Sequence, residues 1–146
     1  MEKVITLYHF CCDRDMSGIR SQGITKGEIV GEKQNKFGKW GRVEFLGWQW
    51  LTYDKNRDRQ SWATRKLIKY SRTEYRFTVE IPEKEVSQLY DRDRLAEEIP
   101  GTERLFDGWA GSENWVVYRG KIPKYWLKKL EHWNKELKQW EEVDLR

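Results

Sequence analysis

The chain opens with a stretch whose side chains alternate between two faces, Val4-Ile5-Thr6-Leu7-Tyr8-His9-Phe10. A period of two is typical of a β-strand, because successive side chains of a strand point to opposite sides. His9 continues the apolar face that Ile5 and Leu7 begin. A short helix follows, and Gly23 suits the left-handed residue that ends it. The pattern predicts a strand that delivers a histidine to a cleft, although a lone histidine in such a place is more often structural.

Later segments add further strands. The cleanest alternation spans 73–81, which predicts a half-exposed antiparallel strand. Residues 42–54 are dense in aromatic and aliphatic side chains and predict one strand or a pair, with 48–52 the surer half. Residues 115–122 predict a short strand that is apolar on both faces. The segment 25–40 reads as a long surface loop, either a lid or a simple connection, with a short strand at 28–30 as an option.

The C-terminal part predicts a long amphipathic helix that begins near Pro123. Its large apolar residues recur at alternating steps of four and three: Trp126, Leu130, Trp133, Leu137 and Trp140. Such a stripe packs on the sheet or faces a second subunit, so a homodimer through this helix is one of the two expectations. Strands with flanking helices together predict an α+β fold with a mostly antiparallel sheet.

Size and charge exclude several classes of protein. The 146 residues fit a single domain, 1–146, and the 28 basic against 24 acidic residues leave a net charge of +4. This balance is compatible with an anionic ligand such as a nucleotide, but it is not that of a dedicated nucleic-acid binder. No apolar run has the length of a membrane span and no signal peptide is recognisable, so we expect a cytoplasmic protein that does not enter membranes.

Two side-chain types bear on chemistry. Nine Trp, seven Tyr and five Phe supply stacking surfaces for a ring as well as core packing. Cys11 and Cys12 are adjacent, which gives neither the spacing of zinc ligands nor a simple structural disulfide. We therefore expect no metal.

Several short motifs, taken in order, resemble those of ADP-ribosyltransferase-like proteins, especially small bacterial and phage members. They are Leu7-Tyr8-His9-Phe10, Ile19-Arg20-Ser21-Gln22-Gly23-Ile24, Trp50-Leu51-Thr52 and the stretch 115–123. The resemblance implies a split, mostly antiparallel sheet with short flanking helices, here followed by the long C-terminal amphipathic helix. It also implies that NAD binds in the cleft as a substrate and that ADP-ribose is transferred to a protein or nucleic-acid acceptor. One form of this expectation is a protein encoded by a phage or mobile element that acts on host systems.

The resemblance also assigns roles to residues. Glu113 is the candidate carboxylate that stabilises positive charge on the ribose as the nicotinamide bond breaks. His9 would hold a ribose, and Thr52 would position the amide or the ribose. Tyr53 is the first choice for stacking on nicotinamide and Trp62 the second. Arg14 or Arg20 would meet the pyrophosphate, or would simply be solvated.

The chain departs from the family's patterns in one respect that matters for chemistry. Ser112-Glu113-Asn114 offers a single acid where arginine-modifying members carry two, and Glu113 is equally well read as an exposed loop carboxylate. Two alternatives therefore stand beside the enzyme. One is a module that binds a nucleotide or a host protein in the same cleft without chemistry. The other is an assembly domain that acts through its tryptophan-rich C-terminal segment.

Overall fold

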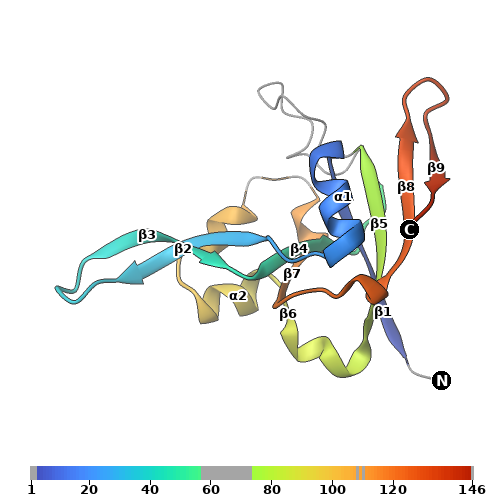
Figure 1. Ribbon diagram of the computed structural model, residues 1–146. Helices are drawn as coiled ribbons and strands as arrows, with labels where there is room; N and C mark the ends of the chain where they lie inside the picture. Colours follow the sequence, from blue (N-terminus) through green and yellow to red (C-terminus); the bar gives the residue numbers. More distant parts are fainter. Residues whose placement is uncertain (1–2, 57–73, 108, 110, 146) are drawn as a thin grey trace.

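The structure, a computed structural model, describes residues 3–56, 74–107, 109 and 111–145. One antiparallel sheet has the strand order β6-β7-β4-β1-β5-β8-β9, and a separate hairpin, β2-β3, extends away from it as an arm (Figure 1). The strands are β1 (Val4–Cys11), β2 (Glu28–Gln34), β3 (Trp40–Leu46), β4 (Trp48–Thr52), β5 (Tyr75–Pro82), β6 (Leu89–Tyr90), β7 (Trp115–Arg119), β8 (Leu127–Asn134) and β9 (Gln139–Val143). The helices are α1 (Asp13–Gln22) and α2 (Arg92–Glu98), with 3-10 turns η3 (Glu83–Gln88), η4 (Thr102–Leu105), η5 (Ser112–Asn114) and η6 (Lys124–Trp126).

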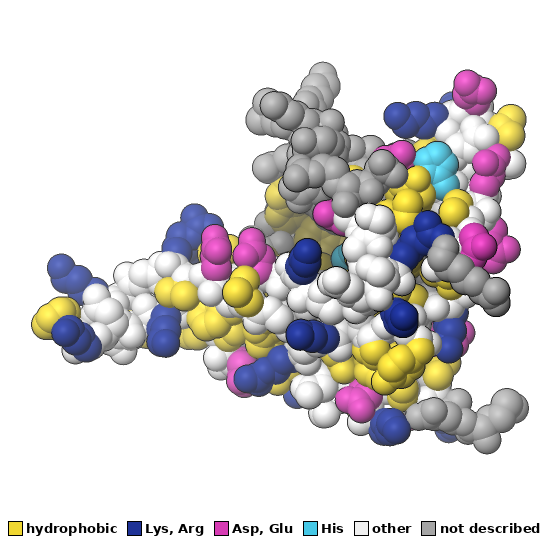
Figure 2. Space-filling model, viewed as in Figure 1, with side chains coloured by type: hydrophobic (Ala, Val, Ile, Leu, Met, Phe, Trp, Pro, Cys, Tyr) yellow, Lys and Arg dark blue, Asp and Glu magenta, His cyan; other side chains and the backbone are white. Residues whose placement is uncertain are grey.

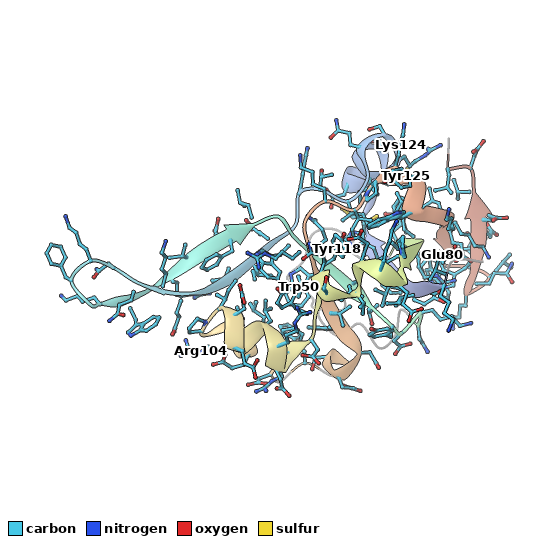
Figure 3. The ribbon with its side chains drawn as sticks, turned by 90° about the horizontal axis from the view of Figure 1, so that it is seen from below. Trp50, Glu80, Arg104, Tyr118, Lys124 and Tyr125 are labelled. Atoms are coloured by element: carbon cyan, nitrogen blue, oxygen red, sulfur yellow. The ribbon has the colours of Figure 1, made fainter. Side chains whose placement is uncertain are left out.

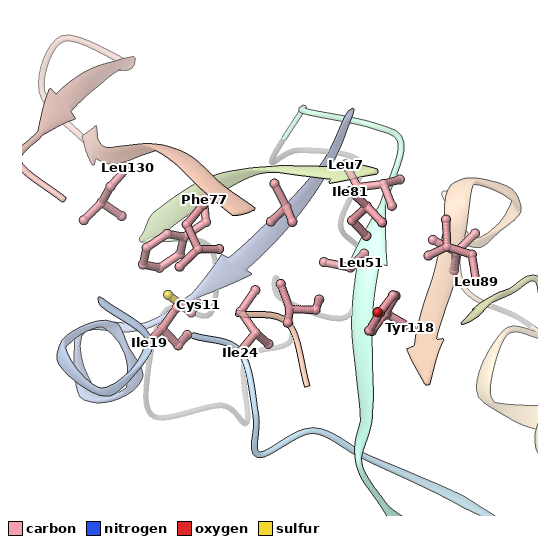
Figure 4. Packing of buried hydrophobic residues seen from close by; sticks show 14 residues of the cluster. Leu7, Cys11, Ile19, Ile24, Leu51, Phe77, Ile81, Leu89, Tyr118 and Leu130 are labelled. Atoms are coloured by element: carbon pink, nitrogen blue, oxygen red, sulfur yellow. The ribbon is translucent and has the colours of Figure 1, made fainter. Parts of the chain in front are cut away.

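One face of the sheet packs against α1 and carries the larger core cluster. Leu7, Leu51 and Phe77 come from three neighbouring strands, and Ile19 of α1 packs in the same cluster (Figure 4). Leu7 and Phe77 are fully buried. Burying a Leu or Phe side chain contributes about 1.5–3 kcal/mol. This cluster is therefore a main source of stability, and it fixes the face on which β1 presents its odd-numbered residues.

The opposite face of the β4–β7 half carries a second cluster. Trp48 from β4 and Trp115 and Val117 from β7 are covered there by Leu95 of α2 and by Phe106, which follows η4. Strands β4 and β7 are therefore buried on both faces. This agrees with the apolar run from which the 115–122 strand was predicted.

Four predicted strands are confirmed: 4–10 lies in β1, 48–52 is β4, most of 73–81 lies in β5, and the first part of 115–122 is β7, which ends at Arg119. Strand β5 was expected to be half exposed, but it lies between β1 and β8 and has no exposed residue. The broad α+β class with a mostly antiparallel sheet is confirmed as well. In the part of the chain that the structure describes, no helix has the length and apolarity needed to cross a membrane.

The predicted long C-terminal helix is wrong, and the fold class is corrected accordingly. The segment forms the β8–β9 hairpin, which extends the sheet beyond β5. Arg76 of β5 and Glu131 of β8 form a buried ion pair at 2.7 Å, and Trp133 packs edge-on against Trp140 across the hairpin. Tryptophan suits strands well, and pairing with the exposed edge of β5 outweighs helix propensity. The dimer surface predicted on that helix disappears with it.

The segment predicted as a loop at 25–40 is also more ordered than expected. Residues 28–34 pair with 40–46 in register, so the chain forms a long hairpin. Its turn has a local cause: the Asn35 side chain accepts hydrogen bonds from the backbone N–H groups of Phe37 and Lys39, and Gly38 has a φ of 81°. An asparagine that stabilises the turn and a glycine that tolerates positive φ are what a tight connection needs.

Candidate functional site

The sheet opens between β1 and β4. Strand β1 pairs with β5 along its whole length, but its pairing with β4 is restricted to Tyr8 opposite Thr52. Beyond that point the later residues of β1 and the earlier residues of β4 separate. One side-chain hydrogen bond still links the two strands there: the His9 ring bonds to the backbone of β4.

Residues on both sides of the opening line a cavity of about 780 Å³. The lining residues come from β1 and β4, from helix α1 and the segment 22–28, and from three residues further along the chain, Leu105, Trp109 and Trp115. The volume falls within the range of about 300–1,000 Å³ that is usual for small-molecule and cofactor sites. Trp50 lies where the arm joins the body (Figure 3), and its indole N–H donates to the Glu28 carbonyl at 3.2 Å.

His9 is held in one tautomer by its neighbour. Its Nδ1 lies 2.8 Å from the carbonyl oxygen of Trp50, and a carbonyl can only accept, so Nδ1 carries the proton. Burial lowers the pKa of His9 below its ordinary value of 6.5, although the bond to Trp50 and the charge of Asp15 both act to raise it. The imidazole is therefore neutral at pH 7, and its Nε2 is a hydrogen-bond acceptor in the cavity wall.

Thr52 contributes a hydroxyl to the lining of the same cavity. Its hydroxyl oxygen accepts a hydrogen bond from the Asp54 backbone N–H at 3.0 Å, which leaves the hydroxyl proton to point elsewhere. The side chain is buried and lines the cavity. A hydroxyl of a ligand can thus donate to His9 while a carbonyl or ring oxygen accepts from Thr52.

Tryptophans form much of the apolar wall. Trp50 and Trp115 meet edge to face with ring centroids 6.0 Å apart, and Phe106 supports both from behind. The indole nitrogen of Trp115 is buried and has no hydrogen-bond partner among the described residues. An unsatisfied buried donor costs about 1–3 kcal/mol. The wall is therefore built of packed aromatic rings, and the unpaired Trp115 N–H lies behind its surface.

The rim of the cavity is anchored to the sheet. Ile24 and Ile122 exchange two backbone hydrogen bonds of 2.9 Å. The buried Gln49 side chain accepts from the Gly27 backbone N–H at 2.7 Å and donates to the Gly120 carbonyl at 2.9 Å. At Gly23, with a φ of 84°, an added Cβ would lie 2.1 Å from the Ile122 carbonyl oxygen. Only glycine fits this crossing, so the rim keeps its shape without a ligand.

Charged and thiol groups complete the lining. Asp15 and Glu28 are the carboxylates among the lining residues and Lys26 is the cation. The Cys12 thiol lies 3.5 Å from an Asp15 oxygen, and Cys11 lines the same wall. The described residues contain no group of three or more His, Cys, Asp and Glu side chains placed to hold a metal ion.

The structure brings together some of the predicted site residues and not others. His9 and Thr52 both line the cavity. Tyr53 is half exposed, and Glu113 is exposed in η5; neither side chain is among those that line it. The two are nevertheless close to each other, because the Tyr53 backbone N–H donates to the carbonyl of Asn114 at 3.0 Å. Trp62 lies outside the described residues.

Of the two predicted phosphate-binding arginines, Arg20 is not among the residues that line the cavity. Arg20 bonds instead to the Leu145 carbonyl and to the Met16 sulfur. The side chain of Arg14 lies outside the described part of the chain.

Sequence reasoning missed the tryptophan wall. Trp50 shares a strand face with Thr52 by simple alternation, so the period of two was a signal for it. Trp115 begins the strand predicted at 115–122, so its strand had a signal as well. Trp109 reaches the cavity through tertiary packing of the segment after α2, for which the sequence carries no local signal. Comparison with known proteins adds no assignment: no family model, curated protein or solved structure matches this chain.

Proposed function

We propose that the cavity between β1 and β4 binds a nucleotide, and that NAD is the ligand to test first. The observation that carries this proposal is the neutral His9, fixed by the Trp50 carbonyl so that Nε2 accepts, in a cavity that Thr52 and three tryptophans also line. A ribose offers hydroxyls to such an acceptor, and a nucleobase or nicotinamide ring offers a flat face to tryptophan. The cavity volume of about 780 Å³ is adequate for a ligand of this size.

Binding is best tested with the His9→Asn variant. Asparagine keeps an amide N–H where Nδ1 donates to Trp50, but it lacks the acceptor at the position of Nε2. We expect NAD or ADP-ribose to stabilise the wild-type protein in thermal unfolding, by about 2.7 kcal/mol at a hundredfold excess over Kd. His9→Asn should weaken binding in calorimetry by about 1–2 kcal/mol, roughly tenfold, because a ligand hydroxyl loses its partner.

The matched control is His132→Asn, since His132 is the other histidine of the chain and lies on β8, away from the cavity lining. This variant should bind like the wild type. If NAD, ADP-ribose and mononucleotides all fail to stabilise the protein, or if both histidine variants bind equally well, the proposal is wrong.

Transfer of ADP-ribose is a second candidate, favoured by the position of Glu113. Glu113 precedes Trp115 by two residues, and the Trp115 ring lines the cavity, so the carboxylate belongs to a segment at the cavity edge. In such a reaction the nicotinamide–ribose bond breaks and its electron pair leaves with the nicotinamide nitrogen. An acceptor nucleophile bonds to the ribose carbon and loses a proton, and a nearby carboxylate stabilises the developing positive charge.

Labelled NAD incubated with cell lysate separates binding from transfer. The transferase candidate predicts label on a macromolecule that is lost in Glu113→Gln and retained in Glu103→Gln, a matched substitution in η4 away from the cavity lining. Asp15→Asn, which removes a carboxylate that does line the cavity, identifies the acid if Glu113→Gln stays active. NAD binding without any labelled product would leave the protein a nucleotide-binding module and would exclude the transferase under these conditions.

A further inference from the structure

The arm formed by β2 and β3 has a composition unlike that of the body. Between positions 33 and 42 it carries four cations and no acid: Lys33, Lys36, Lys39 and Arg42. All four are exposed, and none is in an ion pair within the described part of the chain. The acids of the arm, by contrast, lie nearer its base, where Glu32 pairs with Arg104 at 3.1 Å. Figure 2 shows Lys and Arg side chains along the projecting arm.

Two large aromatic side chains are exposed in the same stretch. Phe37, at the turn, is 78% exposed and Trp40, at the start of β3, is 57% exposed. Lys36 is positioned over the Phe37 ring at 5.2 Å, and Trp40 lies opposite Gln34 across the hairpin. Two large exposed rings at the far end of a protruding arm do not contribute to the core. We therefore read them as a contact surface for a partner.

The arm is a built structure and its base is fixed. Gly31 packs so closely against the body that an added Cβ would lie 2.4 Å from Ile99, and the Glu32 backbone N–H donates to the Pro100 carbonyl at 2.7 Å. The turn is closed by the Asn35 side chain. The backbone that carries the cations and rings is therefore ordered at its base and at its turn, which lowers the entropy cost of binding.

From these observations we infer that the outer part of the arm, residues 33–42, binds single-stranded nucleic acid. The four unpaired cations complement a phosphate backbone, and Phe37 and Trp40 supply faces on which bases stack. A duplex hides its base faces in the helical stack, so exposed rings favour an unpaired strand. This site is separate from the cavity and does not rest on the function proposed for it.

The test measures binding of a fluorescently labelled oligothymidylate by anisotropy at several salt concentrations. For four phosphate contacts, log K should fall with log salt with a slope of about −3, from about −0.7 per contact in single strands. Lys36→Glu/Lys39→Glu should weaken binding at least tenfold and reduce the slope by about half. Phe37→Ala/Trp40→Ala should weaken binding about fivefold or more for each ring while leaving the slope unchanged.

The matched control is Lys121→Glu/Lys124→Glu, which makes the same change of charge at exposed positions on the body. Lys124 is far from the arm in Figure 3. This control and His9→Asn should bind the oligonucleotide like the wild type, so failure of the arm and failure of the cavity are distinguishable. Because the side chains substituted in the arm and body variants are exposed, the melting temperatures of those variants should stay close to that of the wild type.

Three results would overturn the inference. The first is the absence of oligonucleotide binding at low salt. The second is equal loss of binding in the arm and body charge variants, which would indicate a nonspecific effect of net charge. The third is binding to a duplex of equal length, or to anionic phosphatidylserine vesicles, that is as tight as to the single strand and depends on the same rings.

Discussion

His9 occupies the point at which β1 leaves β4, and an imidazole rather than a backbone N–H donates to the Trp50 carbonyl there. The residue therefore has a structural and a chemical consequence. It satisfies a carbonyl that the separating strands would leave without its usual partner. It also leaves Nε2 of the neutral ring as a hydrogen-bond acceptor in the lining of the cavity.

The lowered pKa of His9 predicts a specific dependence of stability on pH. In the unfolded chain this histidine takes up its proton near pH 6.5, while the folded protein takes it up only at lower pH. Between these values the unfolded state binds more protons, so acidification lowers the free energy of unfolding, by at most about 1.4 kcal/mol per pH unit. Well above pH 6.5 the histidine is neutral in both states, so the free energy of unfolding no longer depends on its protonation.

Urea unfolding at pH 7.5 and pH 5.5 measures this dependence. The loss of stability on acidification should be smaller in His9→Asn than in the wild type, because asparagine does not titrate. His132→Asn should retain the share of the pH dependence that is due to His9. An unchanged pH dependence in His9→Asn would show that the imidazole is not the group that resists protonation.

At the level of elements, the C-terminal hairpin is the feature that most distinguishes the structure from a sequence-based expectation. Lys138 ends its turn with a φ of 51°, the left-handed region that a side chain makes unfavourable. We predict that Lys138→Gly stabilises the protein by about 0.5–1 kcal/mol, because glycine removes this strain at some cost in chain entropy. In a helix interior the same substitution would destabilise by about 1 kcal/mol.

Lys135→Gly is the control, since Lys135 lies in the same turn without a positive φ. It should gain nothing. The measurement is the urea midpoint at constant m value. A Lys138→Gly variant less stable than the wild type would contradict the hairpin.

The strands that the sequence predicts correctly are those in which burial and alternation agree. Residues 73–81 place Phe77, Val79 and Ile81 on one face, and all three are fully buried in β5. The C-terminal segment misleads because its Trp and Leu spacing also fits a helix. What decides its structure is the free edge of β5 and the buried partner that Arg76 needs in Glu131, and neither is visible in a local window.

The candidate site was predictable to a similar extent. His9 and Thr52 could be found because each lies at or near the end of a recognisable strand, and ligand-binding residues are often found at such positions. Glu113 was placed by resemblance to a family motif, and its carboxylate is exposed beside the cavity rather than among the lining side chains. Trp109 could not be assigned, since its position depends on how the segment after α2 folds over β4 and β7.

For the whole molecule, the two core clusters share one sheet. The larger cluster contains Leu7 on the face of α1, and the second contains Leu95 beneath the other face, with β4 and β7 contributing to both. Since these strands are common to both clusters, we predict that Leu7→Ala and Leu95→Ala each lower the stability of one cooperative unfolding transition. Both side chains are fully buried, so each loss should be about 2–5 kcal/mol.

Far-UV circular dichroism and tryptophan fluorescence test the prediction together. Their transitions should coincide in the wild type and in both variants. If Leu95→Ala were to separate an early fluorescence change from a later loss of strand signal, the second cluster would be an independent unit.

The position of the two adjacent cysteines makes them natural reporters of the cavity. Cys11 and Cys12 are the two sulfhydryl groups of the chain, and both belong to the wall of the same hollow. Mass-spectrometric counting of alkylated sulfur therefore reads out a single location in the molecule. A ligand bound in that cavity would slow the alkylation of both cysteines, and this change can be measured on the unmodified protein.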